Sequence, residues 1–417
     1  MTRFGTAVQR IDERQAGVEL PLLSVSQTRG VIRQSELFDR PPRADSLDTY
    51  KICRRNDIVF NKMSIRAGAL GVAQEDGLVT YHYEVMRPIG GASSRYIAYL
   101  MKSHRFIGEL IARERGIGAG GATGVRTTEV PFSILRTIDA FIPGPPRQES
   151  IADYLDVQTA KIDALVGKQE QLIETLAERR QAVISHAVTK GLDPNAPMKE
   201  SGVDWLGQVP SAWAIAQVKR CGAVTLGKMV QPEARSDTDI RAPYMRAANV
   251  QPDGVLALDD VNEMWFSVRE LKQLGLRKGD VVVVEGGMGG FGRSAFVGDE
   301  LRGWGFQNSI NRLRPNASSD GRFLTYSLLT ARAVGYMRAV CSAVSMPHLT
   351  AEKLEALRVP KPPLTSQLEI VAYLDHETAK IDALAAKARE MIDVLKERRQ
   401  ALISAAVTGK IDVRGLA

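Results

Sequence analysis

The chain has 417 residues, of which 44% are hydrophobic and 25% are charged, and its formal net charge at pH 7 is +7. These values are ordinary for a folded protein of two or three domains. The three cysteines, Cys53, Cys221 and Cys341, are too far apart to predict a disulfide framework or a metal cluster, and they fit a reducing cytoplasm.

Charge and hydropathy patterns narrow the class of partner. The basic residues are dispersed, without a lysine or arginine tail, so the charge permits a polyanion bound by a folded surface but does not require one. The N-terminal residues contain no apolar segment, and no apolar run approaches about 18 residues, the length that a membrane-spanning helix needs. We therefore expect a cytoplasmic protein that does not enter a membrane.

Residues 1–146 are expected to form a first globular domain of mixed α and β structure. Segments rich in β-branched and aromatic residues predict strands, and a serine before a helical pattern predicts an amphipathic helix. The expected strands are residues 20–26, 57–63 and 80–88, and the expected helix is residues 94–115. A glycine-rich loop, residues 116–124, follows, and a proline-rich segment, residues 140–146, ends the domain.

Residues 147–193 are predicted to form one long helix, and residues 364–417 contain a second copy of it. Without a gap, roughly 25 of about 43 positions are identical between residues 151–193 and 370–412, well above chance for an internal repeat. Apolar residues recur at alternating three- and four-residue steps, the spacing of a coiled-coil seam. The predicted seam is Leu155, Ile162, Leu165, Leu172, Leu176 and Val183 in the first copy and Leu374, Ile381, Leu384, Met391, Leu395 and Leu402 in the second. A helix of about 40 residues, roughly 60 Å long, cannot bury such a stripe alone, so we expect the two copies to pack on each other.

A polar linker, residues 194–202, leads to a second globular domain, residues 203–363, which echoes the first weakly. The matching pairs of segments are 242–256 with 20–32, 277–284 with 54–61, 309–315 with 83–88, and 320–332 with 93–103. The chain is thus a tandem repeat of a globular domain plus a helix, with a period of about 220 residues. The helices are alike while the domains have diverged. We therefore expect the helices to pack on each other or to bind two copies of one partner, and the domains to recognise different targets.

Catalytic motifs are absent from the sequence. The pattern G-x-G-x-x-G occurs at residues 116–121 and 287–292, but the first follows a predicted helix and the second lies between two predicted strands, where it is expected to close a hairpin. The five histidines lack metal-ligand spacing, and there is neither a G-K-[ST] phosphate loop nor a G-x-S-x-G nucleophile elbow. We expect that the chain is not an enzyme and holds no metal or cofactor.

Polar, basic and aromatic residues cluster after the first central strand of each domain. Arginine, lysine, asparagine and glutamine are the side chains that pair with base edges, and basic and aromatic side chains suit phosphate contacts and stacking. Solvated loops would also contain such residues, but the clusters as groups favour DNA contact. The candidates are Asn61, Lys62, Arg66, Tyr81, Tyr83 and Arg126 in the first domain and Arg246, Asn249, Met288, Phe291, Arg293, Asn308 and Asn311 in the second.

Several motifs support a family resemblance over essentially the full length. Each long helix begins with a Pro-Pro pair followed by YLD, and both contain TAKIDAL and ERRQA, while DWLGQVPSAW, residues 204–213, precedes the second domain. With these motifs the chain resembles the specificity subunit of type I restriction–modification systems. One departure is that the first domain has no counterpart of WLGQVPSAW; a misassigned start codon and a shorter first domain both remain open explanations, and either affects the first strand of that domain.

The resemblance implies an α+β fold with pseudo-two-fold symmetry, in which two target recognition domains are separated by the two long helices, paired as an antiparallel coiled coil. It implies a non-catalytic subunit that binds a bipartite, asymmetric site in double-stranded DNA and scaffolds two methyltransferase (M) subunits and the restriction (R) subunits. S-adenosylmethionine, ATP and Mg²⁺ are then expected on those partner subunits. A rigid helix pair would fix the half-site centres about 10 bp apart. The alternative is a coiled-coil scaffold whose globular domains bind proteins.

Overall fold

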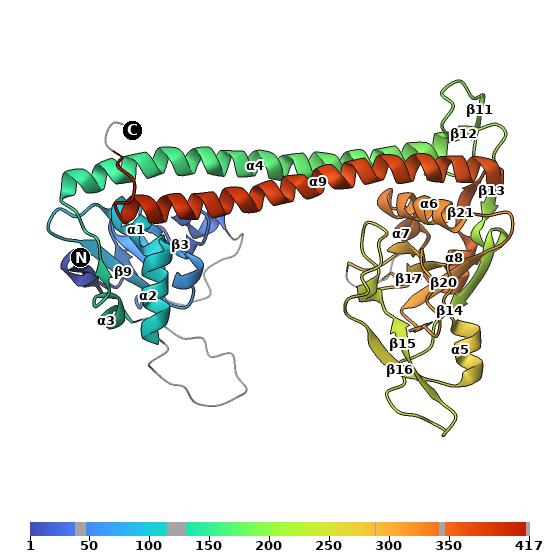
Figure 1. The fold of residues 1–417 in the computed structure, drawn as a ribbon, viewed down its shortest axis with the longest axis horizontal. Coiled ribbons are helices and arrows are strands. Elements are labelled where there is room, and N and C mark those ends of the chain that lie inside the picture. Colours follow the sequence, from blue (N-terminus) through green and yellow to red (C-terminus); the bar gives the residue numbers. More distant parts are fainter. Residues whose placement is uncertain (38–46, 115–130, 288, 342–346, 414–417) are drawn as a thin grey trace. The chain divides into compact units, whose positions relative to one another are not determined.

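The computed structural model describes residues 1–37, 47–114, 131–287, 289–341 and 347–413 (Figure 1). Each of its two units contains a globular domain and one part of both long helices. Unit 1 comprises residues 1–170 and 389–417, and unit 2 comprises residues 171–388.

A four-stranded antiparallel sheet forms the centre of the domain in unit 1. Its strands, in spatial order, are β2 (Val8–Ile11), β9 (Tyr83–Pro88), β6 (Ile58–Asn61) and β7 (Leu70–Val72). Three antiparallel pairs accompany it: β1 (Thr2–Arg3) with β10 (Asp139–Ala140), β3 (Leu23–Ser26) with β4 (Gly30–Arg33), and β5 (Lys51–Cys53) with β8 (Gly77–Val79). The helices of this domain are α1 (Ser94–Lys102), α2 (His104–Glu114) and α3 (Phe132–Leu135).

The domain in unit 2 has a sheet of the same order. Its strands are β14 (Gly222–Leu226), β20 (Ile310–Pro315), β17 (Val281–Val284) and β18 (Ser294–Phe296). A second sheet contains β16 (Asn262–Phe266), β15 (Ile240–Met245) and β19 (Gly305–Phe306), and two pairs join β11 (Met198–Glu200) to β12 (Gln208–Pro210) and β13 (Ala214–Gln217) to β21 (Arg358–Lys361). The helices are α5 (Val268–Leu274), α6 (Gly321–Ala333), α7 (Tyr336–Val340) and α8 (Ala351–Ala356).

The central strand of each sheet is buried on both faces, which explains why it is apolar without interruption. In β6, Ile58 and Phe60 belong to the core that contains α1, while Val59 belongs to the core on the opposite face. In β17, Val281 and Val283 belong to one core and Val282 and Val284 to the other. Successive side chains of a strand point to opposite faces, so each of these apolar residues packs into one of the two cores.

One buried aspartate precedes each of these central strands. Asp57 and Asp280 are each 1% exposed. The carboxylate of Asp57 accepts hydrogen bonds from Nε and Nη2 of Arg87 at 2.8 and 2.9 Å, and that of Asp280 accepts two from Arg314, both at 2.7 Å. These equivalent pairs link the central strand of each sheet to its neighbour and confirm the repeat that the sequence predicted for residues 54–61 and 277–284.

The expected strands lie within their predicted ranges but are shorter, and the helix predicted for residues 94–115 is in fact two helices. Ser103 ends α1, and its hydroxyl then accepts a hydrogen bond from the backbone N–H of Phe106 in the first turn of α2. A serine side chain competes with the helix for backbone hydrogen bonds, which favours such a break. The expected N-cap is confirmed, since Ser93 accepts from the N–H of Tyr96.

The two predicted long helices are confirmed as α4 (Pro145–Lys190) and α9 (Leu364–Val407), with 46 and 44 residues. In unit 2, Leu176 packs with Ile381, whereas Val188, further along α4, shares a core with Ile370, which lies earlier in α9. The two helices are therefore antiparallel in this unit.

The helices are antiparallel in unit 1 as well. Leu155 shares a core with Ile403, and Asp163, further along α4, accepts a hydrogen bond from Nε of Arg399, which lies earlier in α9, at 2.8 Å. Figure 1 shows α1 next to both long helices in this unit.

Four positions of the predicted coiled-coil seam are wrong. Leu165, Leu172, Leu384 and Met391 are 46%, 43%, 53% and 48% exposed. Between Leu374 and Leu395, the buried positions of α9 alternate strictly in four- and three-residue steps and include small residues as well as large ones: Leu374, Thr378, Ile381, Ala385, Ala388, Ile392 and Leu395. The periodic positions thus lie one residue beyond Leu384 and Met391, because the heptad is continued by alanine and isoleucine. Of the other predicted positions, Leu155, Ile162, Leu176, Leu374, Ile381 and Leu395 are buried, and Val183 and Leu402 are partly buried.

Candidate nucleic-acid interface

The structure brings several candidates of the first domain to one edge of its sheet. Asn61 ends β6 opposite Tyr83, the first residue of β9. The backbone N–H of Lys62 donates to the carbonyl of His82 at 3.4 Å, so the loop after β6 lies beside the turn before β9. Tyr81 in that turn is 55% exposed, and its ring lies 3.9 Å from that of His82. The edge therefore presents an amide, a lysine and an aromatic ring together, the combination expected of a surface that contacts bases and phosphates.

A buried ion pair between Lys51 and Glu84 lies next to Tyr83, and the sequence analysis did not predict it. Lys51 is 2% exposed, and its ammonium group donates to the backbone carbonyl of Tyr83 at 2.9 Å and to the carboxylate of Glu84 at 3.1 Å. Arg10 also donates to Glu84, at 2.9 Å. The hydroxyl of Tyr83 lies 3.1 Å from that of Ser24. The one signal in the sequence for this ion pair is that Lys51 belongs to β5, whose other residues are apolar. Arg66 lies in the loop after β6, and Arg126 lies outside the described residues.

In the second domain, the glycine-rich segment closes the hairpin between β17 and β18, as predicted. Gly292 has a φ of +69°, and a Cβ atom there would come within 2.8 Å of Sδ of Met337, so the turn requires glycine for both conformation and space. The backbone carbonyl of Phe291 accepts a hydrogen bond from Nε of Arg332 at 2.9 Å. Burial and the nearby Arg293 lower the pKa of Arg332, which indicates that two cations lie close together beside this turn.

Other candidates of the second domain differ in exposure. Asn308 is exposed in the connection between β19 and β20, and Met288 lies outside the described residues. Glu285, at the end of β17, lies 3.8 Å from Nδ1 of His348, and burial raises the pKa of its carboxyl group. Sequence reasoning did not pair Glu285 with His348, because they are distant in the chain.

Candidates of the second domain also have partners inside the fold, and one of them is Arg293, whose Nη1 donates to the carbonyl of Val250 at 3.4 Å. Three others have closer partners. Asn249 is 2% exposed, and its amide donates to the carbonyls of Ala257 and Asp260 at 2.8 and 3.0 Å. Arg246 forms an ion pair with Asp260. Asn311 is fully buried, and its amide donates to the carbonyl of Leu349 at 2.9 Å. These contacts shape the loops of the domain, and DNA contacts by these three residues stay predictions.

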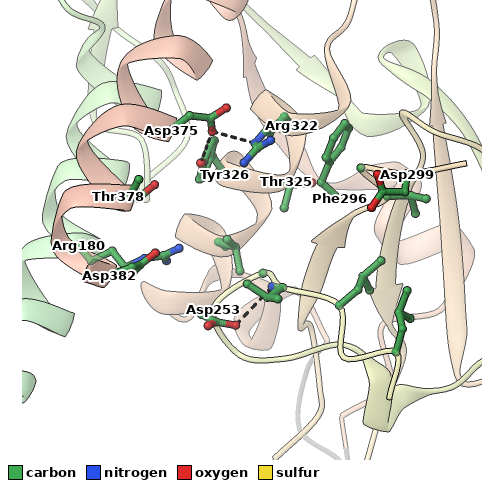
Figure 2. A pocket seen from close by; sticks show the side chains of 18 of the residues that line it. Arg180, Asp253, Phe296, Asp299, Arg322, Thr325, Tyr326, Asp375, Thr378 and Asp382 are labelled. Atoms are coloured by element: carbon green, nitrogen blue, oxygen red, sulfur yellow. Dashed lines mark hydrogen bonds and ion pairs between the residues drawn. The ribbon is translucent and has the colours of Figure 1, made fainter. Parts of the chain in front are cut away.

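In each unit, a cluster of a tyrosine, an arginine and the aspartate of the YLD motif attaches the globular domain to a long helix. We call these clusters joint 1 in unit 1 and joint 2 in unit 2. In joint 1, Asp156 accepts hydrogen bonds from the hydroxyl of Tyr99 at 2.7 Å and from Arg95 at 2.6 Å. In joint 2, Asp375 accepts a hydrogen bond from the hydroxyl of Tyr326 at 2.7 Å and forms an ion pair with Nε of Arg322 at 2.8 Å (Figure 2). Burial, and then the bond to Asp156, raise the pKa of Tyr99 to about 12.

A buried glutamine adds to each joint. Gln148 of α4 accepts a hydrogen bond from the backbone N–H of Ser93, the N-cap of α1, at 2.9 Å. Gln367 of α9 accepts one from the N–H of Asp320, the N-cap of α6, at 2.8 Å. The helix that supports each sheet is thus held by the same side-chain types at equivalent places, which fixes the domain on its helix within each unit.

Among the described residues, no group of three or more histidine, cysteine, aspartate or glutamate side chains is placed to hold a metal ion. In the same part of the chain, no helix is both long and apolar enough to cross a membrane.

Known proteins are similar to this chain in sequence and in fold. Residues 241–392 match the family model described as the type I restriction modification DNA specificity domain. The specificity subunit of the type I restriction enzyme EcoBI of Escherichia coli is 36% identical over 80 residues, covering 18% of this chain and 17% of that protein. The StySPI specificity subunit of Salmonella potsdam is 21% identical over 330 residues, and the EcoKI specificity subunit of Escherichia coli K12 is 23% identical over 207 residues. These two matches cover 78% and 49% of this chain, and 67% and 44% of the relatives.

Two solved structures share the fold over nearly the whole chain. One, described as the structural basis of complex assembly and conformational transition of the type I R-M system, has a TM-score of 0.69 and 15% identity, covering 98% of this chain and 97% of that chain. The other is the HsdS subunit of Thermoanaerobacter tengcongensis, with a TM-score of 0.50 and 16% identity, covering 98% and 96%. The alternative of a general protein scaffold finds no support in these matches. The matched domain and the relatives identify the chain as a DNA specificity subunit of type I restriction–modification systems, and the solved structures show that it shares their fold.

Proposed function

We propose that each globular domain contacts one half of a bipartite, asymmetric site in double-stranded DNA. The observation that supports this proposal is that one scaffold carries two different sets of polar and aromatic groups. Both domains share the sheet order and the joint, but the first has an exposed Tyr81 beside a partly buried Asn61, and the second has an exposed Asn308 and a partly buried Arg293. Amide and guanidinium groups pair with base edges in the major groove. Two such surfaces suit two different half-sites.

The long helices would serve as the docking platform for two M subunits. The four leucine and methionine side chains that are absent from the seam occupy equivalent positions of the repeat, Leu165 with Leu384 and Leu172 with Met391, and all are about half exposed. An apolar surface present twice suits two copies of one protein partner. A variant with Leu165→Gln and Leu384→Gln should lose M subunits during size-exclusion chromatography, while Val255→Gln, which changes another exposed apolar residue, should keep them.

The chemistry of such a complex would belong to the partners. M subunits would supply S-adenosylmethionine and R subunits would supply ATP and Mg²⁺, while this chain contributes binding and positioning and no catalysis. Incubation of the purified chain alone with target DNA and S-adenosylmethionine should therefore give no methylated adenine. Methylation by the chain alone would contradict this assignment.

The central experiment measures DNA binding by the chain purified with its M subunits. The target is first identified by sequencing the methylated bases of a host that carries the system. Specific binding should exceed nonspecific binding by about 10³-fold or more, and scrambling either half-site should abolish the excess. Equal affinity for target and scrambled duplexes would refute the proposal.

Single substitutions then test which domain reads which half. Tyr81→Ala should weaken discrimination at one half-site only, and Arg293→Ala at the other only, each by about 1–3 kcal/mol for a base contact. Arg269→Ala, which removes an exposed arginine on α5, is the matched control for charge and should leave discrimination unchanged. Loss of discrimination at both half-sites from one substitution would contradict separate reading.

The helix pair would set the spacing between half-sites. Four residues inserted into both helices add about one turn, or about 5.4 Å, and should shift the preferred spacer by one or two base pairs. An unchanged preference in the variant would show that the helices do not determine the spacing.

A further inference from the structure

Two neighbouring cavities of unit 1 lie where α1, α4 and α9 meet the turn between β3 and β4. Their volumes are about 490 and 910 Å³, and both are lined by Thr28, Lys102 and Arg399. The larger one is also lined by Arg66 and Lys396. We call the surface formed by Arg66, Lys102, Lys396 and Arg399 the basic cleft.

Positive charge exceeds negative charge in the basic cleft. The larger cavity contains two carboxylates, Asp163 and Glu170, and Asp163 forms an ion pair with Arg399 at 2.8 Å. Within the described part of the chain, no carboxylate lies at ion-pair distance from the ammonium group of Lys102 or Lys396. Two cations of the cleft, Lys102 and Lys396, are therefore not balanced by an ion pair with a described carboxylate.

The surroundings of Lys102 indicate that the cleft lacks negative charge. Burial, and then the neighbouring Arg399, lower the pKa of Lys102 to about 8, and Asp163 offsets this only in part. A buried cation next to another cation is disfavoured in its charged form. A bound anion would supply the missing countercharge.

The equivalent place in unit 2 has the opposite charge. A cavity of about 410 Å³ is built there on joint 2, as Figure 2 shows, and Leu329 lines it at the position of the repeat that Lys102 occupies in unit 1. Asp253 and Asp299 also line this cavity, together with Asp382, which pairs with Arg180 at 3.0 Å. Two copies of one fold thus offer an anion a cationic cleft in one unit and an acidic cavity in the other.

We propose that the basic cleft binds phosphate groups of the DNA duplex beside the half-site contacted by the first domain, and that the acidic cavity of unit 2 has no such role. The proposal rests on the proposed DNA-binding function. It is supported by the position of Arg66, which comes from the same loop as Lys62, so the predicted base contacts and the cleft share one segment of chain. Lysine and arginine contacts to phosphate give affinity and register without reading sequence.

The repeat itself supplies substitutions that the fold tolerates. Lys102→Leu and Lys396→Ala place in unit 1 the residues that unit 2 has at equivalent positions, Leu329 and Ala177. The complex of the full chain with its M subunits is titrated with target duplex between about 50 and 200 mM salt. Each lost phosphate contact should lower the slope of log K against log salt by about 0.9, so the double variant should lose about 1 to 2. Lys102→Arg keeps the charge and should keep the slope.

Lys168→Ala is the matched control, because it removes an exposed lysine from α4 outside the cleft. An unchanged slope in the double variant would overturn the proposal, as would an equal loss in Lys168→Ala, which would show an effect of net charge alone. Loss of M subunits with the DNA slope unchanged would also overturn it and would assign the cleft to an acidic protein segment. If the wild-type complex binds no DNA specifically, the proposed function itself fails, and this outcome is distinguishable from all the others.

Discussion

Joint 2 can be tested with a probe that the chain provides. All four tryptophans, Trp205, Trp213, Trp265 and Trp304, belong to unit 2. Tryptophan fluorescence therefore reports the unfolding of unit 2, whereas circular dichroism reports both units. The perturbation is Asp375→Ala, which removes the common acceptor of the joint.

The expected loss follows from two contacts. The hydroxyl of Tyr326, a buried residue, loses a hydrogen bond to a charged group, which contributes about 1.5–3 kcal/mol. Arg322 is 45% exposed, so its ion pair adds at most about 1 kcal/mol. The free energy of unfolding of unit 2 should fall by about 2–4 kcal/mol. With a urea dependence of about 3 kcal/mol per M, the fluorescence midpoint should fall by about 1 M.

The repeat provides the control. Asp156→Ala makes the same change in joint 1, so it should lower the transition seen by circular dichroism but leave the fluorescence midpoint in place. Tyr326→Phe removes only the hydroxyl and should give a smaller shift than Asp375→Ala. If Asp156→Ala and Asp375→Ala moved the fluorescence midpoint equally, the joints would not act within their own units and the reasoning would fail.

Three further outcomes are expected. Ile381→Ala should lower the fluorescence midpoint by the equivalent of about 2–4 kcal/mol, whereas Leu384→Ala should change it by less than about 0.5 kcal/mol. Equal effects would show that Leu384 is a seam position after all. Asp280→Ala leaves Arg314 without its carboxylate and should cost about 3–5 kcal/mol in the same assay, a loss that Asp299→Ala, at an exposed carboxylate, should not show. The lowered pKa of Lys102 means that the unfolded chain binds more protons between about pH 8 and its ordinary pKa of 10.5, so stability should rise with pH in that window, and Lys102→Leu should remove this rise in circular dichroism melts.

The sequence predicts the architecture of this chain because the repeat is a strong signal. The two long helices, the hairpin at Gly287–Gly292 and the equivalent aspartates before β6 and β17 all lie where their patterns place them. The predicted seam is out of phase at Leu384 and Met391 because leucine and methionine alone do not mark it, and Ala385 and Ile392 continue the heptad. Small residues are buried as readily as leucine when two helices approach closely, and their hydrophobicity gives little warning of it.

The candidate site is less predictable than the fold because asparagine can either contact DNA or form hydrogen bonds inside the protein. Asn61 is partly buried at the end of β6, whereas Asn311, a candidate for the same reason, is fully buried and donates to the carbonyl of Leu349. Nothing in the local sequence separates the two. The joints were missed for another reason: Tyr99 and Asp156 are 57 residues apart, and only the fold brings them together.

Both recognition domains are attached to their long helices by the same set of side chains. Each joint consists of a tyrosine, an arginine and an aspartate, and Gln148 or Gln367 adds a hydrogen bond to it. Whatever its loops contain, a domain whose supporting helix presents an arginine and, four residues later, a tyrosine has the groups that either long helix engages. A domain transferred as one segment between the flanking prolines, with these groups kept, is therefore expected to attach to its long helix through the same contacts.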